Sequence, residues 1–310
     1  MNPLTRLTLS RIFPCIFVLG AGIMLGSCAG VAAIAGTGAQ VAGALGVIDQ
    51  GTADAITRSG EAIGKATEEI TPEQEYYIGR AVAANILTTY KAYSGNQGLL
   101  NYLNRICGAL VINSPKPDIY NGYHVMILEN AEINAFASSG GHIFITRGLL
   151  NCADSEDALA AVIAHEIAHI QLQHSIKAIK TSRITQAIMV TGTSAAGIAA
   201  QNTDLAELTD IFDESVNEII STLINNGYSR EQEFEADALA LSLMASAGYQ
   251  PSSLIDMLRA LEQNQPKSSG GFNKTHPAPA QRISNVEKNV NKYPVQDTRS
   301  FRRQRFTLSR

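Results

Sequence analysis

The chain of 310 residues contains no tryptophan, and its aromatic residues amount to only 6%. Cysteine is also scarce. The four cysteines form no Cys-x-x-Cys pair and no Cys/His cluster, which excludes a thiolate zinc site of the finger type. A basic excess is missing as well, because the net charge is −4. We therefore expect no nucleic acid as a partner, since proteins that bind nucleic acids broadly present a basic surface.

Long apolar runs are absent too. Residues 12–25 and residues 187–200 are apolar, but both runs are shorter than the ~20 residues that a membrane-spanning helix needs. The first run follows two arginines and precedes small residues, which is the layout of a secretory signal. The second run is interpreted as a buried helix or a flap near a functional site.

The end of the first run, Leu25-Gly26-Ser27-Cys28, resembles a bacterial lipobox. It predicts that residues 1–27 are a lipoprotein signal peptide and that Cys28 becomes the lipidated first residue, which anchors the chain to a membrane. A plain signal peptide with an incidental cysteine is the alternative. In the Gram-negative sorting pattern, Asp after this Cys holds a lipoprotein in the inner membrane. Ala29 therefore favours a lipid-anchored protein at the periplasmic face of the outer membrane.

Signal removal leaves Cys107 and Cys152 as the only other thiols. In an oxidising compartment, two remaining cysteines favour a disulfide between them. Two buried free thiols are the alternative, because unpaired cysteine is often buried.

The rest of the chain divides into three parts. Residues 28–70 are predicted to be a tether and an N-terminal helix, residues 71–290 a domain, and residues 291–310 a basic tail in solvent. Thr71-Pro72-Glu73-Gln74 is a capping box that begins a helix. The expected helices are 71–93, 97–112, one from Asp154 onward, 204–225 and 230–247, and the expected strands are 123–128, 134–137 and 142–146, the last two forming a hairpin.

The helix that begins near Asp154 carries His165-Glu166-Ile167-Ala168-His169. Two histidines four residues apart lie on one face of a helix, so both imidazoles can bind one metal ion. Zinc accepts such ligands and in catalytic sites keeps one position open for water. Glu166 can serve as the general base that activates this water.

A third protein ligand is required. The metzincin pattern would place a histidine at position 175, which is Ser175, and a glycine at position 172, which is Leu172, so this class is excluded. His174 is one residue short of that place and is interpreted as a surface or helix-end histidine. The remaining option is one of the acids at Glu231, Glu233, Glu235 and Asp237, among which spacing does not choose.

Residues 228–237, Tyr-Ser-Arg-Glu-Gln-Glu-Phe-Glu-Ala-Asp, resemble the Ser-Arg-x-x-Glu-x-x-Ala-Asp segment of HtpX-like zinc metallopeptidases, gluzincins related to the CAAX prenyl proteases. The resemblance covers about residues 71–290. It implies an α+β zincin-like domain, mostly helical with a small sheet beside the active-site helix, that holds one Zn²⁺ per chain. It also implies Glu233 as the third ligand and Asp237 as the residue that orients a ligating histidine.

Further segments carry the same resemblance: Gln74-Glu75, Gly79-Arg80, Asn134-Ala135-Phe136, Gly140-Gly141, Gly148-Leu149-Leu150, and Thr275-His276-Pro277 with Arg282. Two features depart from the family pattern. Ser138-Ser139 replaces the usual Leu-Pro, and no tetratricopeptide-like repeats follow Arg282. Both the missing repeats and the lack of long apolar helices indicate the small periplasmic lipoprotein branch.

Three further features are candidates for the same site. His276 is expected to donate to an oxyanion or to occupy the open metal position, with a structural loop histidine as the alternative. Arg282 is expected to pair with Asp237 or another acid. The strand at Asn134-Ala135-Phe136, or its neighbour at 142–146, is expected to bind an extended substrate by its main chain.

These residues predict a zinc endopeptidase. The signal segment and the family resemblance together imply that it acts in the bacterial cell envelope, on unfolded or misassembled envelope proteins. One alternative is a zinc-containing chaperone or assembly factor for outer-membrane proteins with little turnover. A second is a self-inhibited protease gated by His276 or by residues 187–200. The sequence leaves the oligomeric state open.

Overall fold

The computed structural model describes residues 39–46, 49–51, 53–54, 57, 69–179, 216–217, 219–264, 272–276, 279–295 and 298–309. The predicted signal peptide, Cys28 and the 187–200 segment lie outside these residues. The chain divides into one unit of Met1–Glu69 with Lys180–Asn202 and a second of Ile70–Ile179 with Thr203–Arg310. None of the helices in the described ranges combines the length and the apolar character needed to cross a bilayer.

In the first unit, the described part of residues 39–57 is largely helical. Gln40 links its two ends, because the Gln40 amide donates to the Asp54 carboxylate and to the Thr57 hydroxyl, each at 3.0 Å.

The second unit is built on a sheet of three strands, β1 (His124–Leu128), β2 (Ala135–Ser138) and β3 (His142–Thr146), in the order β1-β3-β2. β1 and β3 are parallel, whereas β2 and β3 form the predicted antiparallel hairpin. Gly140 and Gly141 in its turn have φ of 72° and 90°, which glycine adopts without steric cost. Because β3 lies between the other two strands, β2 is an edge strand of this sheet.

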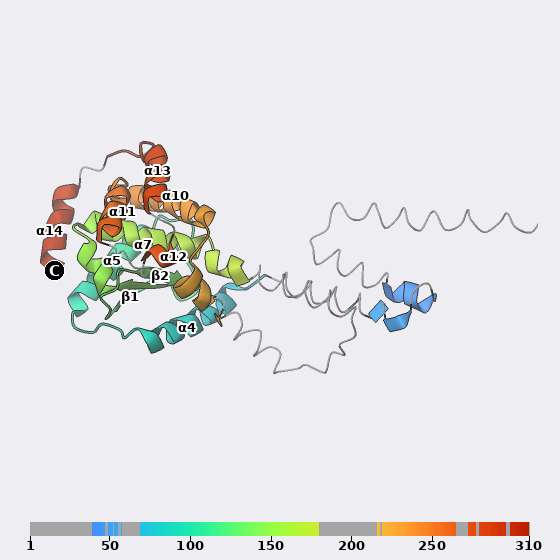
Figure 1. The fold of residues 1–310 in the computed structure, drawn as a ribbon. Coiled ribbons are helices and arrows are strands. Elements are labelled where there is room, and N and C mark those ends of the chain that lie inside the picture. The colour runs from blue at the N-terminus through green and yellow to red at the C-terminus, as the bar shows by residue number, and fades with distance from the viewer. Residues whose placement is uncertain are drawn as a thin grey trace, which may run out of the picture. The chain divides into compact units, whose positions relative to one another are not determined.

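Alternating side chains divide the core between the two faces of the sheet. Ile143 and Ile145 belong to the larger hydrophobic cluster, together with residues of the helix that carries the His-Glu motif. Phe136 and Phe144 belong to the other cluster, with residues of α4 (Pro72–Thr89). The sheet thus lies between α4 and the motif helix (Figure 1).

The N-terminal helices begin at the expected capping residues. Thr71 forms both hydrogen bonds of its capping box with Gln74, so α4 begins as predicted and ends four residues earlier, at Thr89. α5 spans Gln97–Val111 and α6 spans Arg147–Cys152. α7 (Glu156–Gln171) carries the motif, but its N-cap is Ser155 and not Asp154, because the Ser155 hydroxyl accepts from the Ala158 N–H.

The C-terminal half adds η1 (Thr222–Asn226), α10 (Arg230–Ser246), α11 (Ser253–Asn264), α12 (Phe272–Thr275), α13 (Pro279–Val290) and α14 (Arg299–Ser309). α10 and α11 pack against α7, and α13 packs against both of them. Together with the sheet, these helices enclose the middle of α7. The predominance of helix around a small sheet agrees with the predicted α+β class.

The expectation of a solvated basic tail is wrong for residues 299–309. They form α14, which packs against α7 and α5. Arg302 Nε donates to Asp157 Oδ2 at 2.9 Å, and Arg305 Nε donates to Glu156 Oε2 at 3.0 Å. Both acids lie in the first turn of α7 and are buried, so their charges need these partners.

The expected disulfide is not formed either. Cys107 and Cys152 are both free thiols, Cys107 in the core and Cys152 partly buried. The Cys152 thiol instead donates to the carbonyl of Gly148, one turn earlier in α6.

Candidate metal centre

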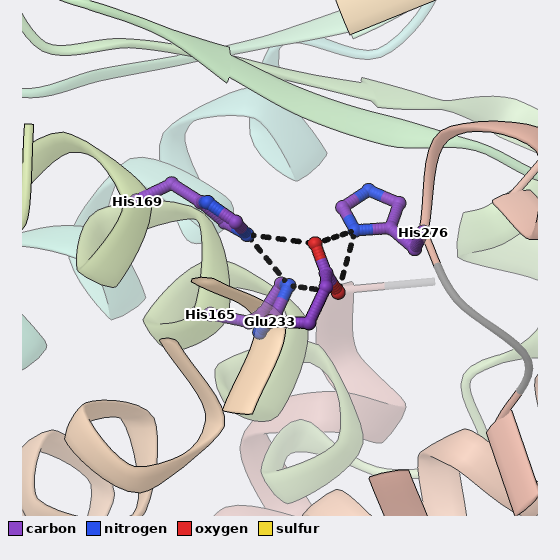
Figure 2. A group of neighbouring side chains, drawn as sticks. All are labelled: His165, His169, Glu233 and His276. Carbon is purple, nitrogen blue, oxygen red and sulfur yellow. Dashed lines mark hydrogen bonds and ion pairs between the residues drawn. The ribbon is translucent and has the colours of Figure 1, made fainter. Parts of the chain in front are cut away.

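The C-terminal half of α7 and the first turn of α10 bring three potential ligands together. His165 and His169 lie on one face of α7, and Glu233 faces them from α10 (Figure 2). The two Nε2 atoms are 3.0 Å apart. Glu233 Oε2 is 3.5 Å from Nε2 of His165, and Glu233 Oε1 is 3.3 Å from Nε2 of His169. Of the four candidate acids on this helix, it is therefore Glu233 that lies with the two histidines.

Asp237 and Arg282 contact His165 and Glu233 on the side away from the facing Nε2 atoms. Asp237 Oδ1 is 3.0 Å from Nδ1 of His165. Arg282, on α13, donates from Nε to Asp237 at 2.9 Å, and its Nη1 lies 3.1 Å from Glu233. All three are buried, so Arg282 compensates two carboxylates that would otherwise lie uncompensated in the core. The Asp237 pairing leaves Nε2 of His165 to face Glu233.

The charges around these groups shift their pKa values. Burial and the Arg282 charge lower the pKa of His165, but hydrogen bonds to Asp237 and Glu233 outweigh them and raise it to about 9. Burial acts to raise the pKa of Glu233, yet His276 and Arg282 hold it well below its usual range. Glu233 is therefore an anion in this site, as a residue that binds a metal cation should be.

Glu166 is buried beside these groups, and neither of its carboxylate oxygens has a hydrogen-bond partner among the described residues. Burial raises its pKa. The cavity that Glu166 and His165 line has a volume of about 10 Å³, close to the smallest that holds one water molecule. A carboxylate with a raised pKa and free oxygens is equipped to exchange a proton at this position.

His276 closes the group from the opposite side (Figure 2). It directly follows α12, and its Nδ1 is 2.9 Å and 3.0 Å from the two oxygens of Glu233. Its Nε2 lies 3.3 Å from the carbonyl oxygen of Ala135, on the edge strand β2. One ligand atom each from His165, His169, Glu233 and His276 lie within 4.8 Å of one another.

The predicted substrate strand lies next to this group. Asn134 precedes β2, and its main-chain carbonyl accepts from the Thr146 N–H at 3.0 Å. Because alternate residues of an antiparallel strand bond to the same neighbour, the N–H and C=O of the next residue, Ala135, point away from β3. Phe136 points into the core with Phe144. Of the three predicted residues, it is therefore Ala135 that presents free-edge main-chain groups toward the site.

Two residues of the site were underestimated from the sequence. His174 was interpreted as a surface or helix-end histidine, but it is fully buried and its Nδ1 lies 2.8 Å from Nδ1 of His169. Tyr228 has no role in the sequence prediction, yet its ring stacks on His169 with centroids 4.1 Å apart. Helical spacing could not find His174, because α7 ends before it.

The donor set fits zinc. Two imidazoles and one carboxylate converge, which is a combination that catalytic zinc sites use. The close approach of two Nε2 atoms and two carboxylate oxygens leaves lone pairs facing one another, unless a proton or a cation lies between them. His165, His169 and Glu233 are thus the residues that would hold the metal.

Comparison with known proteins agrees with this geometry. The chain is 29% identical over 192 residues to the mitochondrial metalloendopeptidase OMA1 of Schizosaccharomyces pombe, a match that covers 60% of this chain and 51% of the relative. It is 26% identical over 198 residues to the beta-barrel assembly-enhancing protease of Escherichia coli K12, covering 62% and 39%. With the metalloprotease LoiP of Escherichia coli K12 it shares 27% over 155 residues, covering 50% and 58%.

The chain thus spans about half the length of the curated relatives it matches. Residues 101–290 match the sequence model of peptidase family M48. This stretch contains both motif segments and exceeds half of the chain, and the chain therefore belongs to peptidase family M48.

Proposed function

We propose that the chain is a zinc-dependent endopeptidase. The observation that carries the proposal is the convergence of His165, His169 and Glu233 beside the buried, unpartnered carboxylate of Glu166. Zinc bound by these ligands supplies a positive charge that acidifies water and polarises a carbonyl. Glu166 takes the proton of the attacking water and then delivers it to the nitrogen of the leaving amine.

The edge strand β2 is proposed to hold the substrate in register with this chemistry. An extended peptide can pair with the outward N–H and C=O groups of Ala135 by strand addition. Main-chain pairing demands little of the substrate sequence. This mode therefore suits a protease of unfolded chains.

The substrates and the compartment are part of the proposal. Relatives named beta-barrel assembly-enhancing protease support unfolded or misassembled envelope proteins as substrates. Lipid anchoring at Cys28, on the periplasmic face of a Gram-negative outer membrane, completes this assignment. The lipobox resemblance supports the anchor, Ala29 supports the outer membrane, and the relatives named beta-barrel assembly-enhancing protease support the envelope.

The test combines metal analysis with one isosteric substitution. The purified full chain should contain one zinc per chain and degrade unfolded casein, and Glu166→Gln should keep the zinc but lose at least about 100-fold in kcat/KM. Glu231→Gln, an exposed acid on α10, is the matched control and should behave as wild type. Equal degradation by wild type, Glu166→Gln and a chelated sample would exclude the zinc peptidase. Zinc-dependent client binding without any cleavage would favour the chaperone alternative.

A second candidate function, a self-inhibited peptidase, has its own support. The ring of His276 stacks on Phe272 and lies against both Glu233 and the Ala135 carbonyl. If Nε2 donates to Ala135, Nδ1 is left with its lone pair toward the metal ligands. The same ring thus covers a metal coordination position and a main-chain acceptor that a substrate strand needs.

Replacing His276 separates a gate from a catalytic donor. A gate predicts that His276→Ala raises the casein degradation rate several-fold, whereas an oxyanion donor predicts a loss of activity. His124→Ala, which removes an exposed histidine on β1, is the control and should leave the casein degradation rate unchanged. Unchanged activity of His276→Ala would count against both roles.

A further inference from the structure

The turn after α7 folds the chain back beneath the motif. α7 ends at Gln171 with Leu172 as its C-cap, and the following residue, Gln173, has a φ of 55°. A residue other than glycine rarely adopts this left-handed conformation, and such strain persists where the surroundings enforce it. Residues 174–179 are then helical again, and the first of them is His174.

His174 is the middle member of a chain of three side chains. Its Nδ1 lies 2.8 Å from Nδ1 of His169, and its Nε2 lies 3.3 Å from Oε2 of Glu235. Glu235 projects from α10, two residues beyond the proposed ligand Glu233. These three hydrogen-bonded side chains therefore connect α7 to α10 on the side of His169 that faces away from Glu233.

The hydrogen positions in this chain follow from one requirement. Nε2 of His169 faces Glu233 and His165, so as a metal ligand it must carry a lone pair and the ring proton must sit on Nδ1. Nδ1–H of His169 then donates to Nδ1 of His174. The proton of His174 is thereby placed on Nε2, from which it donates to the Glu235 carboxylate.

The ring of His169 is also fixed in its plane. Tyr228 stacks on it with an interplanar angle of 18° and a centroid distance of 4.1 Å. The stack defines the plane of the ring, and the hydrogen bond to His174 defines its rotation within that plane. Asp237 acts in the same sense on the other histidine, since it lies 3.0 Å from Nδ1 of His165.

We propose that His174 and Glu235 are positioning residues, which hold His169 in the tautomer and orientation that present Nε2 to the metal. The proposal rests on the proposed function, because it takes His169 as a metal ligand. Removing an outer partner of a ligating histidine weakens metal binding about 10- to 100-fold. Glu235 is half exposed, so its effect is expected to be smaller than that of His174.

The test measures zinc affinity of the full chain by competition with a chromogenic chelator. His174→Leu removes the acceptor at similar size and should weaken zinc binding about 10- to 100-fold. His174→Asn keeps an acceptor near the position of Nδ1 and should restore most of the affinity. Glu235→Gln should weaken binding less than about tenfold, and Glu231→Gln should leave it unchanged.

A structural role alone predicts another pattern. If His174 only fills space, His174→Leu binds zinc as wild type does and His174→Asn offers no advantage, which overturns the proposal. If His174→Leu does not fold, Glu235→Gln decides, and wild-type affinity in that variant overturns the proposal. A wild-type chain that binds no zinc contradicts the proposed function itself, and is thus distinct from both outcomes.

The protonation pattern gives a readout that is independent of affinity. Long-range ¹⁵N–¹H spectra of the histidines in the zinc-loaded chain should show His169 protonated at Nδ1 and His174 protonated at Nε2. His174 protonated at Nδ1 would reverse the direction of the chain and contradict the proposal.

Discussion

Glu166 places an unpaired carboxylate in the core, and such a group lowers the stability of the fold. Burial raises its pKa, and no described residue bonds to its oxygens. In the metal-free chain, Glu166→Gln should therefore raise the free energy of unfolding, by about 1 kcal/mol or more, because a neutral amide loses less on burial than a carboxylate. Urea denaturation of both chains in the presence of a chelator measures the difference. A less stable Glu166→Gln chain would indicate that Glu166 has a partner in solution.

Cys107 provides a residue-scale test of the core. Burial raises the pKa of this thiol to about 12 from its usual value of 9. Because the thiolate is the reactive species, iodoacetamide at pH 8 should label Cys107 in the folded chain about 1000-fold more slowly than in urea. The raised pKa favours the protonated folded state, so the contribution of Cys107 to stability should fall as the pH rises from about 9 towards 12.

Peptide mapping by mass spectrometry resolves the two thiols. Cys152 is more exposed, and its labelling should be less retarded than that of Cys107. If both cysteines resist labelling in urea without a reductant, they are bridged in solution, as the compartment argument predicted. Rapid native labelling of Cys107 would place it outside the core.

Single residues also show how far the sequence could reach. His165, Glu166 and His169 follow from a local motif, and their common helix face follows from helical spacing. Glu233 needed the family resemblance, because four acids shared its segment. The burial of His174 beside His169 could not be predicted, because its position depends on the left-handed turn at Gln173, which no propensity signals.

At the scale of elements, two helical glycines should respond to alanine in opposite directions. A Cβ on Gly79, in α4, would lie 1.7 Å from the carbonyl oxygen of Ser139, so α4 and the hairpin turn would have to separate. A Cβ on Gly108, in α5, meets nothing within 4 Å. Gly79→Ala should therefore destabilise the fold, by roughly 1–3 kcal/mol as other overpacked sites do. Gly108→Ala should stabilise it by roughly 0.5–1 kcal/mol.

Chemical denaturation of the two variants measures this contrast. Equal effects of the two substitutions would mean that α4 does not contact the turn in solution. Because the turn at 139–141 continues β2, Gly79→Ala should also reduce casein degradation.

The docking of α14 through two arginines makes a second element-scale prediction. Arg302 is buried with Asp157, and truncating one partner of a buried pair costs about 3–5 kcal/mol. Arg302→Met should therefore lower the free energy of unfolding by that amount. Arg305 is half exposed, although its partner Glu156 is buried, so Arg305→Met should cost less than Arg302→Met. Arg303→Met, on the exposed face of α14, is the control and should be close to neutral.

These elements separate local from long-range information. Capping boxes at Thr71 and Ser229 begin helices at their own positions, so short sequence windows predict α4 and α10. The pairing of Arg302 with Asp157 joins residues 145 positions apart. The run of arginines therefore predicted exposure to solvent, because the acids that pair with it in α7 are far away in the sequence.

At the scale of the whole second unit, the metal centre is also where separate parts of the fold meet. α7, α10 and α13 supply His165, Glu233 and Arg282, and the chain after α12 supplies His276. All four side chains are at most 3% exposed. The sequence predicted these residues as site candidates, but not that they would be closed from solvent, because closure depends on how α11 to α13 pack over α7.

The burial of these ligands predicts that zinc stabilises the whole fold. A ligand that binds only the folded chain adds about 2.7 kcal/mol at a free concentration 100 times its Kd, which corresponds to roughly 5–10 °C in Tm for a domain of this size. Glu233→Gln removes the anionic ligand while keeping its shape, so it should lose most of this shift. Glu231→Gln should retain it fully.

Differential scanning calorimetry of wild type and both variants, with zinc and with a chelator, measures the shift. Because Glu233→Gln also alters the pairing with Arg282, the comparison is between the zinc-dependent shifts and not between absolute Tm values. An equal shift in Glu233→Gln would place the metal elsewhere in the chain. A wild-type shift that disappears in Glu233→Gln alone would tie the stability of the second unit to the site where α7 and α10 meet.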